Sequence, residues 1–190
     1  MIPAAFLLLT QVSGLRLGES LSLSIPPQPT YSCPEQTGSR PDARLEFFTA
    51  SRQFDSASNP PVIQVEIPRN WTEFMCGFAN RNLTAGCNCG FFFAWDDPGF
   101  RTFYPRSIPF DSQLVMLDKF QSVIAVANAT AYAQAPINAP QNLHYAVLVQ
   151  AGLVQQFGVA LGDPIQIQLP NGTYLGSGPP LADDKIGIHN

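Results

Sequence analysis

The chain has 190 residues, a formal net charge of −4 and only 13% charged residues, with 18 prolines and 14 glycines. An average soluble domain has about 25% charged residues, so something other than surface charge must keep this protein soluble. The composition argues against a helical bundle, a coiled coil or a long disordered chain. The 10 Lys and Arg residues are scattered, which offers no basic patch for nucleic acid or an anionic membrane surface. The length fits one domain with tails.

Residues 1–14 contain an apolar run from Ile2 to Leu9 and end in small residues. Such a segment is typical of a secretory signal peptide, although no Lys or Arg precedes the run. The alternative is a buried N-terminal strand. The run is shorter than the roughly 20 apolar residues that span a bilayer, so we expect no stable membrane insertion. A signal peptide predicts a secreted, extracellular protein.

Asn-X-Ser/Thr sequons support the same secretory route, because this tripeptide accepts N-linked glycans. The four acceptor residues are Asn70, Asn82, Asn128 and Asn171. Glycans at these positions would also explain how a surface with few charges stays soluble. We therefore predict a glycoprotein.

The cysteines are Cys33, Cys76, Cys87 and Cys89, and an even number in a secreted chain predicts two disulfides. On a strand Cys87 and Cys89 would point to the same face, but direct closure of so small a loop would be strained. We therefore expect each of them to pair with Cys33 or Cys76, in an order that the sequence leaves open. The alternative, a zinc site, lacks the usual ligand spacing and a nearby histidine. We predict no metal and no cofactor.

Residues 15–44 form an extension rich in proline, serine and glycine, in which the alternating run Leu21–Ile25 predicts an edge strand or a strand donated to a neighbour. Short apolar runs then recur between turn signals across a domain at residues 45–170, before a tail at 171–190. The runs lie at 45–48, 62–67, 90–95, 114–117, 123–126, 145–149 and 164–169. This spacing predicts a mainly β fold, a single compact antiparallel barrel or sandwich.

Two stretches break the strand pattern and predict short helices. The first would have Thr72 as its N-cap and run towards Asn80, with Glu73 near the positive end of the helix dipole. The second would span 151–157 and stop at Gly158. Among the turn signals is Asp97-Pro98-Gly99.

The most unusual local feature is the aromatic run Phe91–Phe93, with further aromatic residues downstream. Three adjacent phenylalanines on a strand place side chains on both faces, which predicts a strand buried on both sides. The alternative is an exposed aromatic surface built from Trp95, Phe103 and Tyr104 that stacks on sugar rings or docks another subunit.

Several short motifs, taken in order, resemble the family called domain of unknown function 192 (DUF192). That family has the motifs Glu-Arg, Gly-Leu-Met-X-Arg and Gly-Met-Leu-Phe in succession, followed by an Ile-Pro-Leu-Asp turn. It ends with Tyr-Val-Leu-Glu, then Ala-Gly, then a single Gly, and finally Gly-Asp. The matching residues here are Thr72-Glu73, Gly77–Arg81, Gly90–Phe93, Ile108–Asp111, Tyr145–Leu148, Ala151-Gly152, Gly158 and Gly162-Asp163. The resemblance covers roughly residues 62–169. It implies a fold of strands with short helices, and because the activity of the family is undefined it implies no chemistry.

The departures from the family pattern concern polar residues. A Met-Lys-Asn-Thr segment is replaced by residues around Phe103–Ser107, and the Glu of the ending falls on Leu148. The Arg beside Glu73 falls on Phe74. A polar site built from those family residues is therefore not expected here.

Few histidines or carboxylates suit catalysis. His144 abuts a predicted strand without a nucleophile-elbow motif, which favours a hydrogen-bonding role at a strand edge, and His189 lies next to the C-terminus.

Asp96 and Asp97 could act as paired carboxylates for glycoside hydrolysis or calcium, but the adjoining Pro-Gly favours a role in a turn. Asp111 and Asp163 also lie at turns and are predicted to cap backbone donors.

These features predict a secreted, non-catalytic structural or interaction protein. In its specific form it is a self-assembling subunit of a glycosylated extracellular polymer, in which an N-terminal strand adds to the sheet edge of a neighbour. One alternative is a secreted carbohydrate-binding module using Trp95 and Tyr104. The other is a hydrolase using Asp96 or Asp111. The expected partners are N-linked glycans and further copies of the chain.

Overall fold

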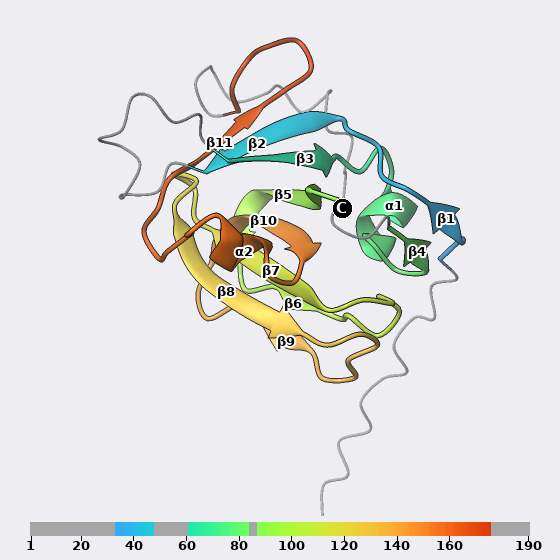
Figure 1. The fold of residues 1–190 in the computed structure, drawn as a ribbon. Helices are drawn as coiled ribbons and strands as arrows, with labels where there is room; N and C mark the ends of the chain where they lie inside the picture. The colour runs from blue at the N-terminus through green and yellow to red at the C-terminus, as the bar shows by residue number, and fades with distance from the viewer. Residues whose placement is uncertain (1–32, 48–60, 84–86, 176–190) are drawn as a thin grey trace, which may run out of the picture. The chain divides into compact units, whose positions relative to one another are not determined.

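The computed structural model describes residues 33–47, 61–83 and 87–175, which all lie within the unit Tyr31–Asn190 (Figure 1). These residues form eleven strands and two short helices. In chain order they are β1 (Gln36–Thr37), β2 (Ala43–Phe47), β3 (Val62–Glu66), α1 (Trp71–Cys76), β4 (Arg81–Asn82), β5 (Cys89–Gly99), β6 (Thr102–Phe103), β7 (Ser112–Leu117), β8 (Val123–Ala129), β9 (Ile137–Asn138), β10 (Leu143–Gln150), α2 (Leu153–Gln156) and β11 (Ile165–Gln168). The segment 1–14 and the run Leu21–Ile25 lie outside the described residues.

Seven strands form one sheet in the order β11-β2-β3-β5-β10-β7-β8. The predicted mainly β, sandwich-like fold with two short helices is confirmed. Neighbouring strands are antiparallel except β3 and β5, which are parallel, so the expectation of an entirely antiparallel sheet is wrong at this pair. Between these strands the chain passes through α1 and β4, and a crossover of this length allows the next strand to run parallel.

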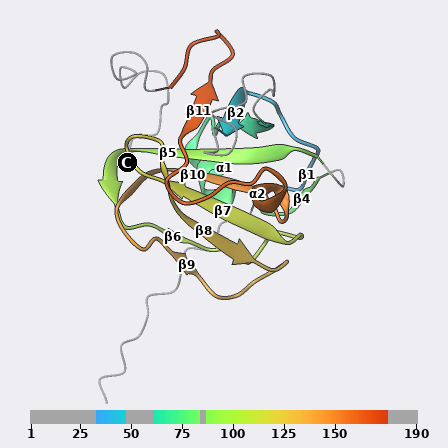
Figure 2. The ribbon, with the colours of Figure 1, turned by 60° about the vertical axis from the view of Figure 1, so that its left-hand side comes forward.

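The sheet curls, so that the start of β8 meets the start of β11 (Figure 2). Ser122 and Pro164 form an isolated bridge there, and the Val123 amide donates to the Asp163 carbonyl at 3.0 Å. No ladder continues between β8 and β11 in the described part of the chain, so the sheet is not a closed barrel.

Two hydrophobic cores lie on opposite faces of the sheet. The first lies within the curl and includes Phe92 with side chains of β2, β3 and β11, and α2 adds Leu153 and Val154. The second includes Phe91 and Phe93 and is covered by α1. Phe91, Phe92 and Phe93 are 1%, 1% and 6% exposed, which confirms the predicted burial on both sides. In Figure 1, α1 lies with β1 and β4 beside the sheet.

Helix α1 begins two residues earlier than predicted. Its N-cap is Asn70, whose side chain accepts a hydrogen bond from the Glu73 amide at 2.9 Å, and Thr72 lies inside the helix. Asparagine in extended backbone caps as well as threonine does, so the two candidates could not be ranked by type. Helix α2 ends before Gly158, whose φ of 67° is the left-handed conformation that glycine favours.

The predicted turn at Asp97-Pro98-Gly99 is wrong, because β5 continues to Gly99. Tyr145 pairs with Ala94 but Leu143 pairs with Gly99, so the residues between Ala94 and Gly99 bulge out of the ladder. A bulge tolerates proline because the ladder hydrogen bonds are already interrupted there.

Candidate functional site

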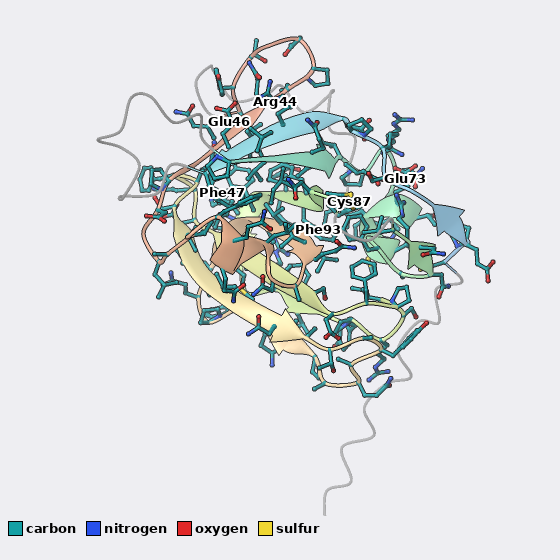
Figure 3. All side chains as sticks on the ribbon, in the orientation of Figure 1. Arg44, Glu46, Phe47, Glu73, Cys87 and Phe93 are labelled. Atoms are coloured by element: carbon teal, nitrogen blue, oxygen red, sulfur yellow. A yellow bond between two sulfur atoms is a disulfide. The ribbon has the colours of Figure 1, made fainter. Side chains whose placement is uncertain are left out.

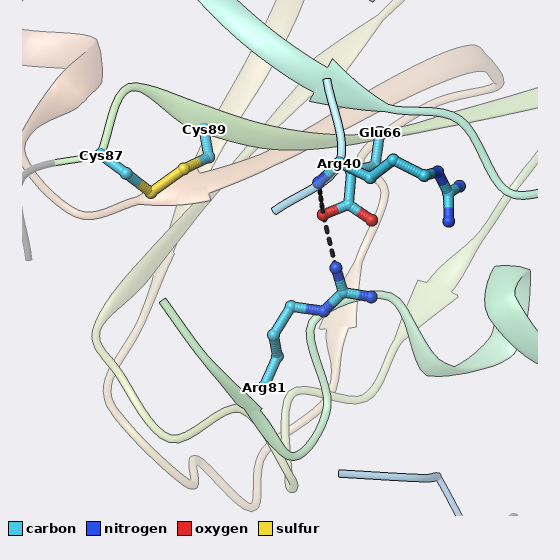
Figure 4. Close-up of a disulfide and its surroundings, with 5 residues drawn as sticks. All are labelled: Arg40, Glu66, Arg81, Cys87 and Cys89. Atoms are coloured by element: carbon cyan, nitrogen blue, oxygen red, sulfur yellow. Dashed lines mark hydrogen bonds and ion pairs between the residues drawn. A yellow bond between two sulfur atoms is a disulfide. The ribbon is translucent and has the colours of Figure 1, made fainter. Parts of the chain in front are cut away.

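A buried ion pair joins β3 to β4. The Arg81 guanidinium donates to Oε1 of Glu66, and the same oxygen accepts from the Arg40 amide at 2.9 Å (Figure 4). Glu66 is 1% exposed and Arg81 is 6% exposed. In the alternation of β3, Glu66 lies on the face opposite Ile63 and Val65. The chain around Arg40 and the Arg81 side chain cover this face, so Glu66 is buried.

Further charges surround the pair near the N-terminus of α1. Arg40 Nε donates to Asp42 at 2.7 Å, and its Nη2 donates to Glu73 at 3.2 Å. Burial lowers the pKa of Arg40, but the hydrogen bonds and charges of Asp42 and Glu73 outweigh this effect and raise the pKa above its ordinary value. Arg69 donates to Asp42 at 3.0 Å. Three arginines therefore face three carboxylates, and the cluster is electrically balanced.

A pocket of about 270 Å³ opens beside this cluster. Its walls come from α1, the residues on either side of it and the segment before β1. They comprise Pro34, Asn70, Thr72, Glu73, Cys76, Gly77, Ala79 and Arg81. Figure 3 shows Glu73 at α1, on the side of the sheet where β1 and β4 lie. The two charged residues of its lining already have partners, since Glu73 pairs with Arg40 and Arg81 pairs with Glu66.

The family model of DUF192, described as "Uncharacterized ACR", matches residues 53–167, which is more than half of the chain. The chain belongs to the DUF192 family. The pocket lining includes Glu73 and Arg81, the charged residues of two motifs that this DUF192 chain shares with its family. Sequence reasoning used them to recognise the family and missed that they meet, together with Glu66 and Arg40, in one charged cluster. The only signal was their occurrence in those motifs.

Two solved structures share the DUF192 fold of this chain. One, from Sinorhizobium meliloti 1021, is described as a "putative transcription regulator"; it aligns with a TM-score of 0.57 and 18% identity over 65% of this chain and 91% of its own. The other is a protein of unknown function from Novosphingobium aromaticivorans DSM 12444, with a TM-score of 0.56 and 21% identity over 64% of this chain and 82% of its own. At these identities the similarity concerns the fold alone. No curated protein matches this chain.

The disulfides differ from the expected pairing. Cys33 pairs with Cys76, and Cys87 pairs with Cys89, so the expectation that Cys87 and Cys89 pair with the other two is wrong. The reason is local, because residues two apart on an extended chain point to one face. Their Cα atoms are 5.2 Å apart, within the usual range of about 4.4–6.8 Å for disulfides.

Of the three residues predicted to form an exposed aromatic surface, Trp95 and Phe103 lie together, partly exposed and packed against the second core. The rings of Trp95 and Phe103 are 5.8 Å apart, and the Arg101 guanidinium lies 5.3 Å from the Trp95 ring. Phe74 joins Trp95 to Trp71, a 44% exposed residue that sequence reasoning did not include. Tyr104 is 47% exposed, and the Arg106 guanidinium covers its ring at 5.7 Å. Trp71, Trp95, Arg101 and Phe103 are called the aromatic surface below.

The four sequon asparagines are all exposed. Asn70, Asn128 and Asn171 accept hydrogen bonds through Oδ1, from the Glu73 amide, the Gln113 side chain and Thr173 respectively. These contacts use the carbonyl oxygen and leave the amide nitrogen, the atom to which a glycan is joined, outside those bonds. Asn82 lies in β4 beside the buried Arg81. The positions are therefore accessible to the predicted modification.

The candidate catalytic residues are dispersed. Asp111 accepts from the Ala131 amide and Asp163 from the Ala160 amide, both at 2.8 Å, as expected of caps. Asp96 and Asp97 are exposed in the bulge of β5. His144 is half-buried in β10, beside Tyr145. Within residues 33–47, 61–83 and 87–175 no cluster of three His, Cys, Asp or Glu side chains could hold a metal, and no helix could cross a membrane.

Proposed function

We propose that this protein is a secreted, glycosylated, non-catalytic module that assembles with copies of itself through the free edge of β8. The observation that carries the proposal is that the β8 edge is uncharged and largely unpaired in the described residues. Val123–Ala129 contains no charged residue and no proline, and across the described ranges only β7 pairs with it beyond its first residues. An uncharged edge strand of this length is a template for another strand.

The opposite edge of the sheet supports the same proposal by contrast. The chain after β11 turns back over it, so that the Leu169 amide donates to the Thr173 carbonyl and the Leu175 amide to the Ile167 carbonyl, both at 2.8 Å. Gln168 and Tyr174 form a bridge there. One edge is thus covered by its own chain, while β8 carries no equivalent cover in the described residues.

The proposed occupant of the β8 edge is the run Leu21–Ile25 of a neighbouring copy. Its alternation of leucine or isoleucine with serine suits a strand that has one buried face, and it is uncharged like β8. Main-chain hydrogen bonds provide the affinity of such strand addition, and the side-chain alternation provides the register. The accessible sequons support the secreted, glycosylated part of the proposal.

A lysine placed in the β8 edge is expected to prevent assembly. In Ala127→Lys, neighbouring copies would have to bury a charge along the shared edge, so association weakens by about tenfold or more, the equivalent of about 1.4 kcal/mol. Because Ala127 also packs against the second core, circular dichroism first checks that the variant keeps the parent fold. Gln166→Lys, at an exposed position of the covered edge strand β11, is the matched control and assembles like the parent. Light scattering after size-exclusion chromatography and negative-stain imaging measure the outcome. A parent that stays monomeric at high concentration, or a deletion of residues 1–30 that leaves the particle size unchanged, contradicts the proposal.

The aromatic surface favours a second candidate, carbohydrate binding. Indole rings stack on the apolar faces of sugars, and Arg101 beside Trp95 adds a hydrogen-bond donor. Trp95→Ala is expected to weaken binding on a glycan array about fivefold or more, since an aromatic contact is worth about 1 kcal/mol. The control is Phe120→Ala, at a 74% exposed ring on another turn. An array without signal for the parent removes this candidate.

The hydrolase hypothesis gains no support from the geometry. Asp111 is used as a cap on the Ala131 amide, and Asp96 lies in an exposed bulge. Asp→Asn variants at both positions that differ from the parent across a substrate panel would revive it.

A further inference from the structure

We propose that Cys87–Cys89 is a thiol–disulfide exchange site of the folded protein, which takes two electrons from an accessible dithiol. The two cysteines flank Asn88 at the beginning of β5, with a sequence separation of 2 (Figure 4). The inference goes beyond assembly, because it assigns a covalent reaction to residues that the β8 edge does not use.

The fold depends little on this disulfide. A cross-link stabilises a protein mainly by restricting its unfolded chain, and the restriction grows with the length of the closed loop. Cys87–Cys89 closes a loop with a sequence separation of only 2. Cys33–Cys76 has a sequence separation of 43 and joins the segment before β1 to α1. Opening Cys87–Cys89 therefore costs the native state little, while opening Cys33–Cys76 costs much more.

Neighbouring contacts hold the two residues in place when the bond opens. The Gln64 amide donates to the Asn88 carbonyl at 2.9 Å, and Gln64 pairs with Cys89 in the β3–β5 ladder. Gly90 is packed so closely that an added Cβ would lie 2.9 Å from a Val65 methyl carbon. The start of β5 is thus anchored by backbone and packing. Reduced thiols at positions 87 and 89 would remain on one face of the strand, ready to form the bond again.

The two cysteine residues differ in exposure. Cys87 is partly exposed, whereas Cys89 is 4% exposed. Thiol–disulfide exchange requires a thiolate to approach one sulfur in line with the bond, so the sulfur that solvent reaches is the one attacked. The geometry makes Cys87 the attacked residue and Cys89 the leaving and resolving thiol.

The exchange between the dithiol and the Cys87–Cys89 disulfide proceeds in two steps. A thiolate of the dithiol attacks Sγ of Cys87, the Cys87–Cys89 bond breaks, and Cys89 leaves as a thiolate that takes a proton from water. The second thiolate of the dithiol then attacks the sulfur of its own mixed disulfide, which releases Cys87 as a thiolate that is protonated in turn. The dithiol is oxidised to a disulfide, and the protein gains two thiols. The substrate class is an accessible dithiol of a small molecule or of an unfolded or extended peptide.

The first test is reduction of the full chain with graded dithiothreitol. Free thiols are trapped with N-ethylmaleimide and assigned by peptide mass spectrometry, while circular dichroism follows the fold. Cys87 and Cys89 are expected to be labelled about tenfold or more faster than Cys33 and Cys76, with the circular dichroism unchanged. Equal rates, an earlier opening of Cys33–Cys76, or labelling only after the fold is lost would overturn the proposal.

Single variants test the direction of attack. Cys89→Ser leaves Cys87 free, and with oxidised glutathione it is expected to form the mixed disulfide about tenfold or more faster than Cys87→Ser, in which only the buried Cys89 remains. Both variants keep Cys33–Cys76, so a difference in folding is not the cause, and circular dichroism checks this. Equal rates in the two variants, or no adduct in either, would contradict the assignment.

Discussion

Replacing Arg81 with alanine is expected to lower the free energy of unfolding by about 3–5 kcal/mol. The substitution removes the guanidinium that pairs with Glu66 and leaves that carboxylate, whose side chain is 1% exposed, without its charged partner. A buried charge that loses its partner retains the full cost of its dehydration, and the single hydrogen bond from the Arg40 amide does not replace a cation. Denaturant unfolding followed by circular dichroism measures the change.

Arg69→Ala is the matched control for this prediction. Arg69 also donates to a carboxylate, Asp42, but its side chain is 63% exposed, so solvent screens the pair and its loss costs about 0–1 kcal/mol. The double variant Glu66→Met/Arg81→Met removes both charges at once and is expected to be more stable than Arg81→Ala. Equal effects of Arg81→Ala and Arg69→Ala would show that burial of the pair does not decide its contribution.

Replacing Phe92 with alanine is expected to cost about 3–5 kcal/mol, because the change opens a cavity in the core within the curl of the sheet. Phe92 is 1% exposed and its ring stacks on Tyr145 with centroids 5.7 Å apart. It packs with Val147 and Ile63 in the same core. The loss of stability is expected to lower the denaturant concentration at the midpoint of unfolding. The dependence of the free energy of unfolding on denaturant concentration is expected to change little.

Phe100→Ala makes the same chemical change at a 73% exposed ring beyond the end of β5. Because almost no apolar surface is buried there, the expected change is within about 0.5 kcal/mol. If the two phenylalanine variants lost similar stability, the burial of the aromatic run on both faces would be in doubt.

The charged cluster explains what the family motif residues Glu73 and Arg81 do in this fold. Glu73 accepts from the Arg69 amide and from Arg40, while Arg81 pairs with Glu66, so the motif residues tie α1 and β4 to β3 and to the chain before β2. At two of the positions where the chain departs from the family pattern, the residues are apolar. Phe74 packs on Phe93, and Leu148 lies in the same core.

Much of the fold was predictable from local pattern. The apolar runs identified β3, β5, β7, β8, β10 and β11, and the run of three phenylalanines indicated a strand covered on both faces. These predictions succeed because side-chain burial in a strand depends on residues one and two positions away. The two-residue strands β1, β4, β6 and β9 have no such period, and sequence reasoning missed them.

The sequence by itself determined a mainly β protein of the DUF192 family, because the spacing of its apolar runs predicted the strands and its ordered short motifs identified the family. Only the tertiary structure decided that β3 and β5 run parallel and that Glu66 is buried against Arg81. The physical reason is the same in each case. These features depend on which distant segments are brought together by the crossover through α1 and the curl of the sheet, and no local period in the sequence records those distances.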